Sequence, residues 1–405
     1  MAKYRALSLR QRASGHEAFL QAHRPEVNPP LAKGKEIIRV AEPLIGPEEA
    51  ELVAQVVAST LVSSVSPFVG EFERALAKRC DAREAIAMTC GTHALDILMY
   101  ALDVGPGDEV IVPALTFISV GASVVRAGAK PIFVDVSART LNMCTEGVKA
   151  AITPRTRGII GVHTYGHPCD MEALEELADA HGLFLLEDAC EALGATWRTR
   201  PIGSFGDAAV HSFYSNKMMT TGNGGAITTS HPELASLVRE LRGYSYAPGR
   251  FFWHEHMPFN VRMSGLQAAI GVAQLGRMDA LLEHHAWMAR SYEAALSGLP
   301  GLELPSPCAE GEHVYWMYTI HIDESLFGCS THALRTHLAN EGIETRPVFT
   351  PLHAQPILSA AAGVQGPFPN ADWASKSGIN LPSGATLTQA QLERICEVIR
   401  GACSG

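Results

Sequence analysis

Six short runs of residues, several of them almost wholly apolar, constrain the fold of this chain more than any other feature of its sequence. Gly, Pro and Asp bound these runs, which lie at residues 108–113, 130–136, 158–163, 183–188, 208–214 and 225–229. Strands that are covered on both faces are apolar throughout, because neither face meets water. Helix patterns lie between several runs, at residues 92–102, 117–127 and 171–181. This alternation predicts an α/β fold with a mostly parallel sheet and helices on both faces.

The pattern changes along the chain and predicts three parts. Residues 1–36 are basic and polar, which is typical of a disordered arm or of a short helix that packs on a partner. Residues 37–285 hold the alternating runs and form the expected large domain. A long helical stretch, opened by a Ser cap, is predicted at residues 264–299. Residues 286–405 form a smaller α+β domain, with a few strands and two helices among the segments 313–322, 331–341 and 388–400.

Charge and composition exclude several classes of protein. The chain has 32 Lys and Arg against 42 Asp and Glu, a net charge of −10, which argues against a nucleic-acid partner. No apolar run approaches the roughly 18 residues of a membrane helix, and no apolar signal core begins the chain. The nine cysteines show neither a CxxC pair nor another metal-ligand spacing. We therefore expect a cytoplasmic protein with no membrane partner and no metal.

Lys217 stands in a setting that suits chemistry. It follows the run at residues 208–214 and precedes a glycine-rich turn at residues 220–225, where backbone can approach a ligand closely. Ligands of α/β sheets bind at the carboxyl ends of the strands. A lysine that is partly desolvated there can form a Schiff base with a carbonyl compound. The ordinary alternative is a solvated surface lysine, and this residue alone does not decide between them.

Glu187 and Asp188 end a run that carries no other charge. An acidic residue at this point can simply cap the next turn. Alternatively, Asp188 faces a cationic ring nitrogen. Pyridoxal phosphate (PLP) needs such a carboxylate, because its protonated pyridine ring takes up the electron pair left when a substrate carbon loses its proton.

Gly91 and Thr92 join a predicted strand from Glu84 to a predicted helix. The N-terminus of a helix offers free N–H groups and the positive end of the helix dipole, which suits a phosphate. The simpler interpretation makes Thr92 only an N-cap. Ser212 is placed to add a hydroxyl to the same phosphate. Phe117 can lie flat on a cofactor ring, or it can belong to the core.

Phosphate turn, aromatic residue, strand-end Asp and post-strand Lys follow one another as in fold type I PLP enzymes, and the chain resembles the DegT-type sugar aminotransferases from about Arg39 to Arg400. The matching segments are GTHALDILMYALDVGPGDEVIVPALTFIS, GAKPIFVDV, AITPRTRGIIGVHTYGHPCDM, LLEDACEALGA, IGSFGDAAVHSFYSNKMMTTGNGGAIT, FNVRMSGLQAAIGVAQL and GIETRPVFTPLH. The resemblance implies the fold type I architecture, PLP as cofactor and amination of a nucleotide-linked keto-sugar.

Within this family, some segments are most similar to the members that aminate GDP-4-keto-6-deoxymannose to GDP-perosamine, an amino sugar of lipopolysaccharide O-antigens. These segments are LVSSVSPFVGEFE, SNKMMTTG, HVYWMYT, GIETRPVF and INLP. The resemblance implies L-glutamate as amino donor and 2-oxoglutarate as second product. Amination of another keto-sugar (3-keto, or UDP- or TDP-linked) remains an alternative, as do a PLP sugar dehydratase and a PLP-binding regulator. The presence of Lys217 favours transamination, because the dehydratase subgroup carries His at this position.

The resemblance also implies residue roles. Lys217 corresponds to the lysine that bonds the cofactor and carries protons, and Asp188 to the partner of the pyridine nitrogen. The phosphate is assigned to Gly91, Thr92 and Ser212, and the ring face to Phe117. Asn260 corresponds to an asparagine that reaches the phosphate from the neighbouring subunit, which implies a homodimer.

Four further residues are expected on the substrate side. Glu191 stands where many relatives have Gln and is expected near the ring hydroxyl or the sugar, as a catalytic and substrate-binding residue. His163 is expected to contact the substrate. Arg346 and Arg250 are candidates for the diphosphate or the glutamate carboxylate, although Arg250 can equally be an exposed surface charge. The loop at residues 243–263 carries six aromatic residues, so it either packs on the core or lines a dimer interface.

Overall fold

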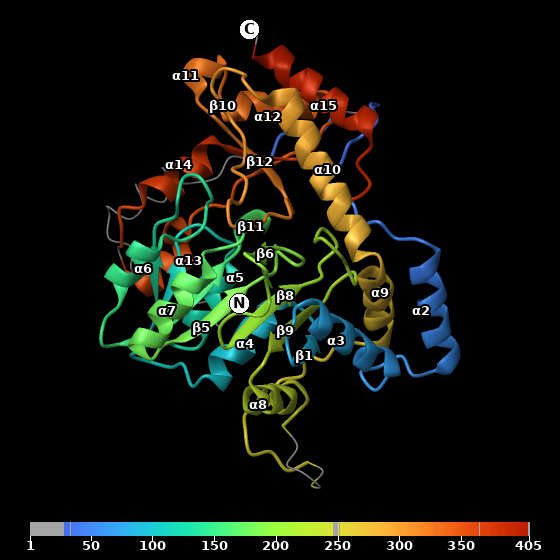
Figure 1. The fold of residues 1–405 in the computed structure, drawn as a ribbon, viewed down its shortest axis with the longest axis vertical. Coiled ribbons are helices and arrows are strands. Elements are labelled where there is room, and N and C mark those ends of the chain that lie inside the picture. The colour runs from blue at the N-terminus through green and yellow to red at the C-terminus, as the bar shows by residue number, and fades with distance from the viewer. Residues whose placement is uncertain (1–27, 33, 246–249, 251, 364, 404–405) are drawn as a thin grey trace, which may run out of the picture.

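The computed structural model describes residues 28–32, 34–245, 250, 252–363 and 365–403, and Figure 1 shows their arrangement. Most of the predicted arm at residues 1–36 lies outside the described residues. The fold contains a seven-stranded sheet and a four-stranded sheet, each with its own hydrophobic core, and a third, three-stranded sheet between them. Along the longest axis of the molecule, the elements of the four-stranded sheet lie towards one end (Figure 1).

The seven-stranded sheet confirms the predicted α/β class. Its strand order is β1-β9-β8-β5-β4-β2-β3. The strands are β1 (Glu84–Met88), β2 (Glu109–Pro113), β3 (Lys130–Val134), β4 (Thr156–Val162), β5 (Phe184–Asp188), β8 (Ala208–Ser212) and β9 (Gly225–Thr229). Neighbours from β8 to β3 pair in parallel, whereas β9 runs antiparallel to both β8 and β1. All six apolar runs of the sequence therefore form strands of this sheet.

Helices cover the sheet, as the continuous burial of its strands requires. Every residue of β2 and of β9 is buried, so neither face of these strands meets water. The covering helices include α4 (Gly91–Ala101), α5 (Ser119–Arg126), α6 (Thr145–Ala151), α7 (Met171–His181) and α8 (Pro232–Arg242). The three helix patterns of the sequence match α4, α5 and α7 to within two residues at each end. Two earlier helices, α2 (Pro47–Ser59) and α3 (Pro67–Arg79), pack on a later one, α9 (Gly265–Gly276).

The predicted long helical stretch at residues 264–299 consists of two helices. Ser264 caps α9, because its hydroxyl accepts a hydrogen bond from the backbone N–H of Gln267, while its own backbone N–H donates to Oε1 of Gln267. Arg277 then interrupts the helix with φ −108° and ψ 9°, and α10 (Met278–Leu296) follows. The predicted Ser cap and the predicted helical stretch are confirmed, with one interruption at Arg277.

The smaller part is an antiparallel sheet with helices packed on it. Its strand order is β10-β12-β14-β13, from β10 (Leu302–Glu303), β12 (Tyr318–Ile322), β14 (Gly378–Leu381) and β13 (Arg346–Pro347). Two helices match the prediction, α12 (Thr331–Asn340) and α15 (Gln389–Ala402). The helices α11 (Glu324–Phe327), α13 (Pro356–Ala362) and α14 (Pro369–Ser377) were not anticipated. Three further short strands, β6 (Thr196–Trp197), β7 (Arg200–Pro201) and β11 (Gly311–Glu312), form the third sheet.

The helix α10 joins the two cores. Near its start, Met278 and Leu281 belong to the core of the large sheet. Further along, Met288 and Tyr292 belong to the core of the small sheet. We therefore propose that the division between the domains at residues 37–285 and 286–405 falls within this helix.

The described residues contain neither a candidate membrane span nor a candidate metal site. Within the described ranges, no helix combines the length and the apolar composition that crossing a membrane requires. The same part of the chain holds no group of three or more His, Cys, Asp or Glu side chains arranged to bind a metal ion.

Candidate active site

Three strand ends of the large sheet meet at one place. The turn after β1 brings Gly91 against the residues that follow β5, since a Cβ on Gly91 would lie 2.8 Å from Sγ of Cys190. The same Cβ would lie 3.4 Å from Cβ of Ser212, at the end of β8. The backbone N–H of Cys190 donates to Oδ1 of Asp188 at 3.0 Å. The predicted residues Gly91, Asp188 and Ser212 are thus neighbours.

The glycine-rich turn after Lys217 serves this meeting of strands. A Cβ on Gly225 would lie 2.4 Å from the backbone nitrogen of Gly91 and 2.3 Å from the carbonyl carbon of Cys90. No residue with a side chain fits at such a distance. The sequence suggested that backbone at this turn approaches a ligand. At Gly225, it is instead the start of β9 that approaches the turn before α4.

The start of α4 has the features of a phosphate site. Its N-cap is Cys90, whose side chain makes no capping hydrogen bond. Thr92 is therefore the second residue of the helix, and the simpler interpretation of Thr92 as N-cap is wrong. Its hydroxyl oxygen lies 2.7 Å from that of Ser119. An uncapped helix of 11 residues presents N–H donors and the positive end of its dipole beside the Ser212 side chain.

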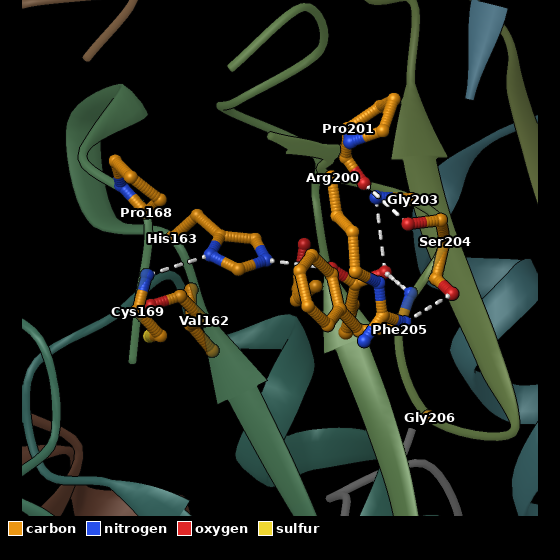
Figure 2. Close-up of polar contacts among 12 residues, drawn as sticks. Val162, His163, Pro168, Cys169, Arg200, Pro201, Gly203, Ser204, Phe205 and Gly206 are labelled. Atoms are coloured by element: carbon orange, nitrogen blue, oxygen red, sulfur yellow. Dashed lines mark hydrogen bonds and ion pairs between the residues drawn. The ribbon is translucent and has the colours of Figure 1, made fainter. Parts of the chain in front are cut away.

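The two carboxylates at the end of β5 have different surroundings. Glu187 is fully buried, and its carboxylate accepts hydrogen bonds from Nε2 of His163 at 3.2 Å and from the backbone N–H groups of Gly203 and Phe205 at 2.9 and 3.0 Å. Figure 2 shows the His163 ring directed towards β5, with its other nitrogen facing the backbone of Cys169. Burial raises the pKa of Glu187. Glu187 and Asp188 are adjacent on a strand, so their side chains leave opposite faces of the sheet.

Lys217 lies in a partly enclosed position next to a second acid. Its Nζ is 3.7 Å from Oε1 of Glu191, and its side chain is 13% exposed. Glu191 is buried, and its other carboxylate oxygen accepts a hydrogen bond from the backbone N–H of Tyr165 at 2.8 Å. Burial raises the pKa of Glu191 to about 7, although the Lys217 ammonium opposes this shift. A carboxyl group that titrates near neutrality beside a lysine is suited to proton transfer.

Aromatic side chains form one side of the site. Phe117 is 53% exposed, and its ring centre lies 6.0 Å from that of Phe349. Phe349 stacks on Tyr165 at 5.0 Å, and Tyr165 stacks on Trp316 at 6.1 Å. The ammonium of Lys217 lies over Trp316, with 3.7 Å from Nζ to the ring centre. Tyr165 and Trp316 were not among the predicted site residues, although the segments HTYGHPCDM and HVYWMYT that contain them carried part of the resemblance.

The structure separates His163 from the substrate role predicted for it. His163 has no exposed surface. The backbone N–H of Cys169 donates to its Nδ1 at 3.0 Å, so Nε2 carries the proton and donates to Glu187. Both ring nitrogens are therefore used within the protein, and this geometry does not support a contact between His163 and the substrate.

Among the described residues, no hydrogen bond or ion pair joins Arg346, Arg250 or Asn260 to Lys217. Arg346 is half-buried on β13 and lines, with Phe349, a hollow of about 590 Å³. Arg250 is exposed, and its guanidinium lies 5.9 Å from the ring centre of Trp253. Asn260 is exposed and donates to the hydroxyl of Tyr244 at 2.7 Å. Figure 1 shows the loop after α8, which carries the last two of these residues, at the opposite end of the molecule from the four-stranded sheet.

These residues fit PLP. The uncapped start of α4 and the nearby hydroxyl groups match the donor set that a phosphate needs. A side chain on Gly91 would fill the space beside Ser212 and Cys190. Asp188 supplies a carboxylate for a cationic ring nitrogen, and the exposed face of Phe117 is available to stack on a ring.

Comparisons with known proteins agree with this assignment. The sequence matches the DegT/DnrJ/EryC1/StrS aminotransferase family over residues 43–400. It is 42% identical to the GDP-perosamine synthase of Caulobacter vibrioides over 88% of this chain and 96% of that protein. It is 35% identical to the GDP-perosamine synthase of Vibrio cholerae, over 90% of this chain and 98% of that protein.

A solved structure shows the same fold. The aminotransferase TlmJ from Streptoalloteichus hindustanus superposes with a TM-score of 0.86 at 30% identity, covering 91% of this chain and 99% of that one. The site geometry, the sequence match and this superposition agree. The chain therefore belongs to the DegT/DnrJ/EryC1/StrS aminotransferase family and is a PLP-dependent sugar transaminase.

Proposed function

We propose that this enzyme transfers the amino group of L-glutamate to the 4-keto carbon of GDP-4-keto-6-deoxymannose, giving GDP-perosamine and 2-oxoglutarate. The observation that carries the proposal is that the charges of Lys217 and Asp188 both act on Cys190, whose sulfur lies beside Gly91 at the start of α4. The substrate is suggested by the GDP-perosamine synthases, to which the chain is 35–42% identical over most of its length. A role in the supply of lipopolysaccharide O-antigen, in the cytoplasm, follows from that substrate.

Each of the clustered residues has a part in this reaction. PLP, when bound, supplies the conjugated ring that takes up the electron pair of a deprotonated substrate carbon. Lys217 holds the cofactor covalently, removes the proton from the donor carbon and later delivers a proton to the sugar carbon. Asp188 keeps a proton on the ring nitrogen. Gly91, Thr92 and Ser212 hold the phosphate, and Glu191 faces the ring hydroxyl or the sugar.

Arg346 is proposed to bind an anionic part of a substrate. A guanidinium group binds carboxylates and phosphates through paired hydrogen bonds. Arg346 is half-buried beside the hollow that Phe349 also lines, and Phe349 leads to Phe117 through ring contacts. We assign it to the glutamate carboxylate or to the diphosphate of the sugar nucleotide.

The active unit is proposed to be a homodimer. Phe252, Trp253 and Met257 on the loop after α8 are 81%, 56% and 72% exposed, which is unusual for large apolar side chains grouped on one loop. A second copy that covers this loop would remove the apolar surface from water. In that arrangement Asn260 would reach the phosphate of the neighbouring site.

The amino-donor half-reaction is tested by absorbance spectroscopy. Purified enzyme is expected to show the band of a lysine-bound PLP near the visible edge, and excess L-glutamate is expected to shift it to shorter wavelength. Lys217→Ala should lack the lysine-bound band. A wild-type spectrum that glutamate leaves unchanged would overturn the donor assignment, and a screen of GDP-, UDP- and TDP-linked keto-sugars with the glutamate-treated enzyme tests the acceptor.

Complementation tests the homodimer. Asn260→Ala should weaken catalysis by about ten- to a hundredfold, as expected when a hydrogen bond to a charged group is lost. Lys217→Ala is expected to be inactive. If Asn260 acts across the interface, mixed dimers of these two variants contain one intact site, so co-expression should restore activity. No restoration in purified mixed dimers would show that Asn260 does not act across the interface.

A further inference from the structure

Lys217 is held in a closed ring of contacts with three other residues. Its Nζ lies 3.7 Å from the centre of the Trp316 ring and 3.7 Å from Oε1 of Glu191. Tyr165 completes the ring, because its backbone N–H donates to Glu191 at 2.8 Å and its side chain stacks on Trp316 with 24° between the planes. Glu191, Trp316 and Tyr165 are 5%, 6% and 3% exposed. The lysine is therefore confined between an aromatic face and a carboxylate, largely away from water.

Trp316 holds the lysine at two points. Besides its contact with the ammonium, its ring N–H donates to the backbone carbonyl of Asn216 at 2.6 Å. Asn216 immediately precedes Lys217, so one side chain fixes both the backbone before the lysine and the end of its side chain. Trp316 lies 100 residues later in the chain, between β11 and β12. The contact therefore ties the smaller part of the fold to the catalytic lysine.

Amino-group transfer requires Lys217 to occupy two positions. With PLP bound, Lys217 would be released as a neutral amine when the amine of the donor takes its place on the cofactor carbon. It then takes the proton of the substrate carbon and becomes an ammonium group. This ammonium must remain within reach, because it returns the proton later. A place is needed that stabilises an ammonium group and keeps water away from it.

We infer that Trp316, together with Glu191, forms the docking position of the freed Lys217 amine, and that Trp316 is a positioning residue for proton transfer. The inference rests on the proposed function of Lys217. An aromatic face attracts a cation through its quadrupole, and the attraction is largest where water is excluded. The carboxylate on the other side adds a second attraction. Tyr165 keeps both in place through its stacking contact and its backbone hydrogen bond.

The docking position is tested by chemical labelling of the lysine. An amine-reactive reagent is applied to the full-length protein, both after removal of the cofactor and after treatment with excess L-glutamate, and the Lys217 peptide is quantified by mass spectrometry. Lys217 should be labelled slowly in the wild type. In Trp316→Leu its labelling, relative to that of the exposed Lys130, should increase by about five- to thirtyfold, which matches the loss of a buried cation–π contact.

Three further variants separate the contributions. Trp316→Phe retains an aromatic face, so the labelling of Lys217 should stay within about threefold of that in the wild type. Glu191→Gln removes the carboxylate on the other side of the lysine and should also increase the labelling of Lys217. Trp373→Leu is the matched control, because Trp373 stacks on His321, 4.5 Å away, and should leave Lys217 unaffected. If Trp316→Leu does not fold, Trp316→Phe and Glu191→Gln still decide the question. Equal labelling of Lys217 in all folded variants would overturn the inference.

Kinetics distinguish this inference from the proposed function. In single turnovers with L-glutamate, Trp316→Leu should lower the limiting rate by about five- to thirtyfold, with the half-saturating glutamate concentration changed less than about twofold. If Trp316→Leu raises only the half-saturating glutamate concentration and leaves the limiting rate unchanged, the positioning role would also be overturned. If Lys217→Ala transaminates like the wild type, the proposed function fails, whatever the labelling shows.

Discussion

The end of β5 carries two adjacent carboxylates, and the two faces of the sheet use them differently. On one face, Glu187 has no exposed surface and accepts three hydrogen bonds, from His163, Gly203 and Phe205. These three donor residues are labelled in Figure 2. On the other face, Asp188 accepts one hydrogen bond from the N–H of Cys190. The thiol of Cys190 also interacts with the Asp188 carboxylate. The Glu187 carboxylate is held by three hydrogen bonds within the protein, whereas the Asp188 carboxylate lies on the face where we propose that PLP binds.

This difference shows how one strand end can serve both stability and chemistry. The carboxylate of Glu187 ties the ends of β4 and β5 to the segment that carries Gly203 and Phe205. That network holds β5 in place, so Asp188 on the other face is held rigidly as well. Substitutions of Glu187 and of Asp188 should therefore affect stability and catalysis to different degrees.

The largest effect is expected from Glu187→Leu. The substitution leaves the His163 ring and the two backbone N–H groups buried without an acceptor, and removal of one partner from a buried pair costs about 3–5 kcal/mol. The free energy of unfolding, measured by denaturant titration, should fall by that amount. Folded Glu187→Leu should still bind PLP. A loss below about 1 kcal/mol would show that this network contributes little to stability.

Asp188→Asn should have the opposite profile. Asn retains an oxygen that can accept from Cys190, so the unfolding free energy should change by less than about 1 kcal/mol. The variant should keep much of its PLP, yet lose turnover by about a hundred- to a thousandfold, because the negative charge opposite the ring nitrogen is gone. Steady-state kinetics and the cofactor content of the purified variant provide the measurement. Turnover within about threefold of wild type would contradict the role of Asp188.

Glu191 gives a pH dependence with a definite sign. Its pKa is about 7 in the folded chain, raised by burial from the usual value of 4.5. As pH rises from 4.5 towards 7, the unfolded chain loses this proton first. The free energy of unfolding therefore falls over this pH range. Each pKa unit of difference is worth about 1.4 kcal/mol, so the total loss above pH 7 is roughly 3 kcal/mol.

Glu191→Gln removes this titration. Relative to the cofactor-free wild type, the variant should gain stability between about pH 5 and about pH 8. Denaturant titrations of both proteins at several pH values measure the difference. A constant difference across the range would show that Glu191 titrates normally in the folded chain.

The smallest effect is expected at the phosphate site. Thr92→Ala removes one hydroxyl group and its contact with Ser119. The affinity for PLP should fall by about five- to tenfold, the effect of a single hydrogen bond. Titration of the cofactor-free protein with PLP measures this change, and Thr116→Ala is a control at a buried threonine of the turn between β2 and α5. An equal loss of affinity in both variants would argue against a specific role for Thr92.

Much of the fold followed from local sequence patterns. The six apolar runs became strands of one sheet, and the helix patterns became α4, α5 and α7, because burial on both faces leaves a direct mark on composition. The interruption at Arg277 was not visible, since the apolar periodicity continues on both sides of it. The short helices α11, α13 and α14 were also missed, because four to nine residues are too few for a clear periodic pattern.

The candidate site was predicted in part. Asp188 and Ser212 end strands, and Gly91 and Lys217 follow strands. The carboxyl ends of parallel strands meet at one edge of a sheet, so their proximity follows from the order of elements. His163 also follows a strand, but its ring is directed to Glu187 instead of to the substrate side. Trp316 and Tyr165 were missed, because they meet Lys217 and Glu191 through contacts between segments far apart in the chain.

The sequence by itself determined the class of fold, the order along the chain of the site residues at the strand ends, and the family. These depend on local composition and on motifs that can be read along the chain. Only the tertiary structure decided which of the two adjacent carboxylates is hydrogen-bonded within the protein and which faces the proposed ligand site. Neighbouring residues on a strand point to opposite faces, and the sequence does not state what covers each face. The same holds for Lys217, whose position depends on a tryptophan 100 residues beyond its neighbour Asn216.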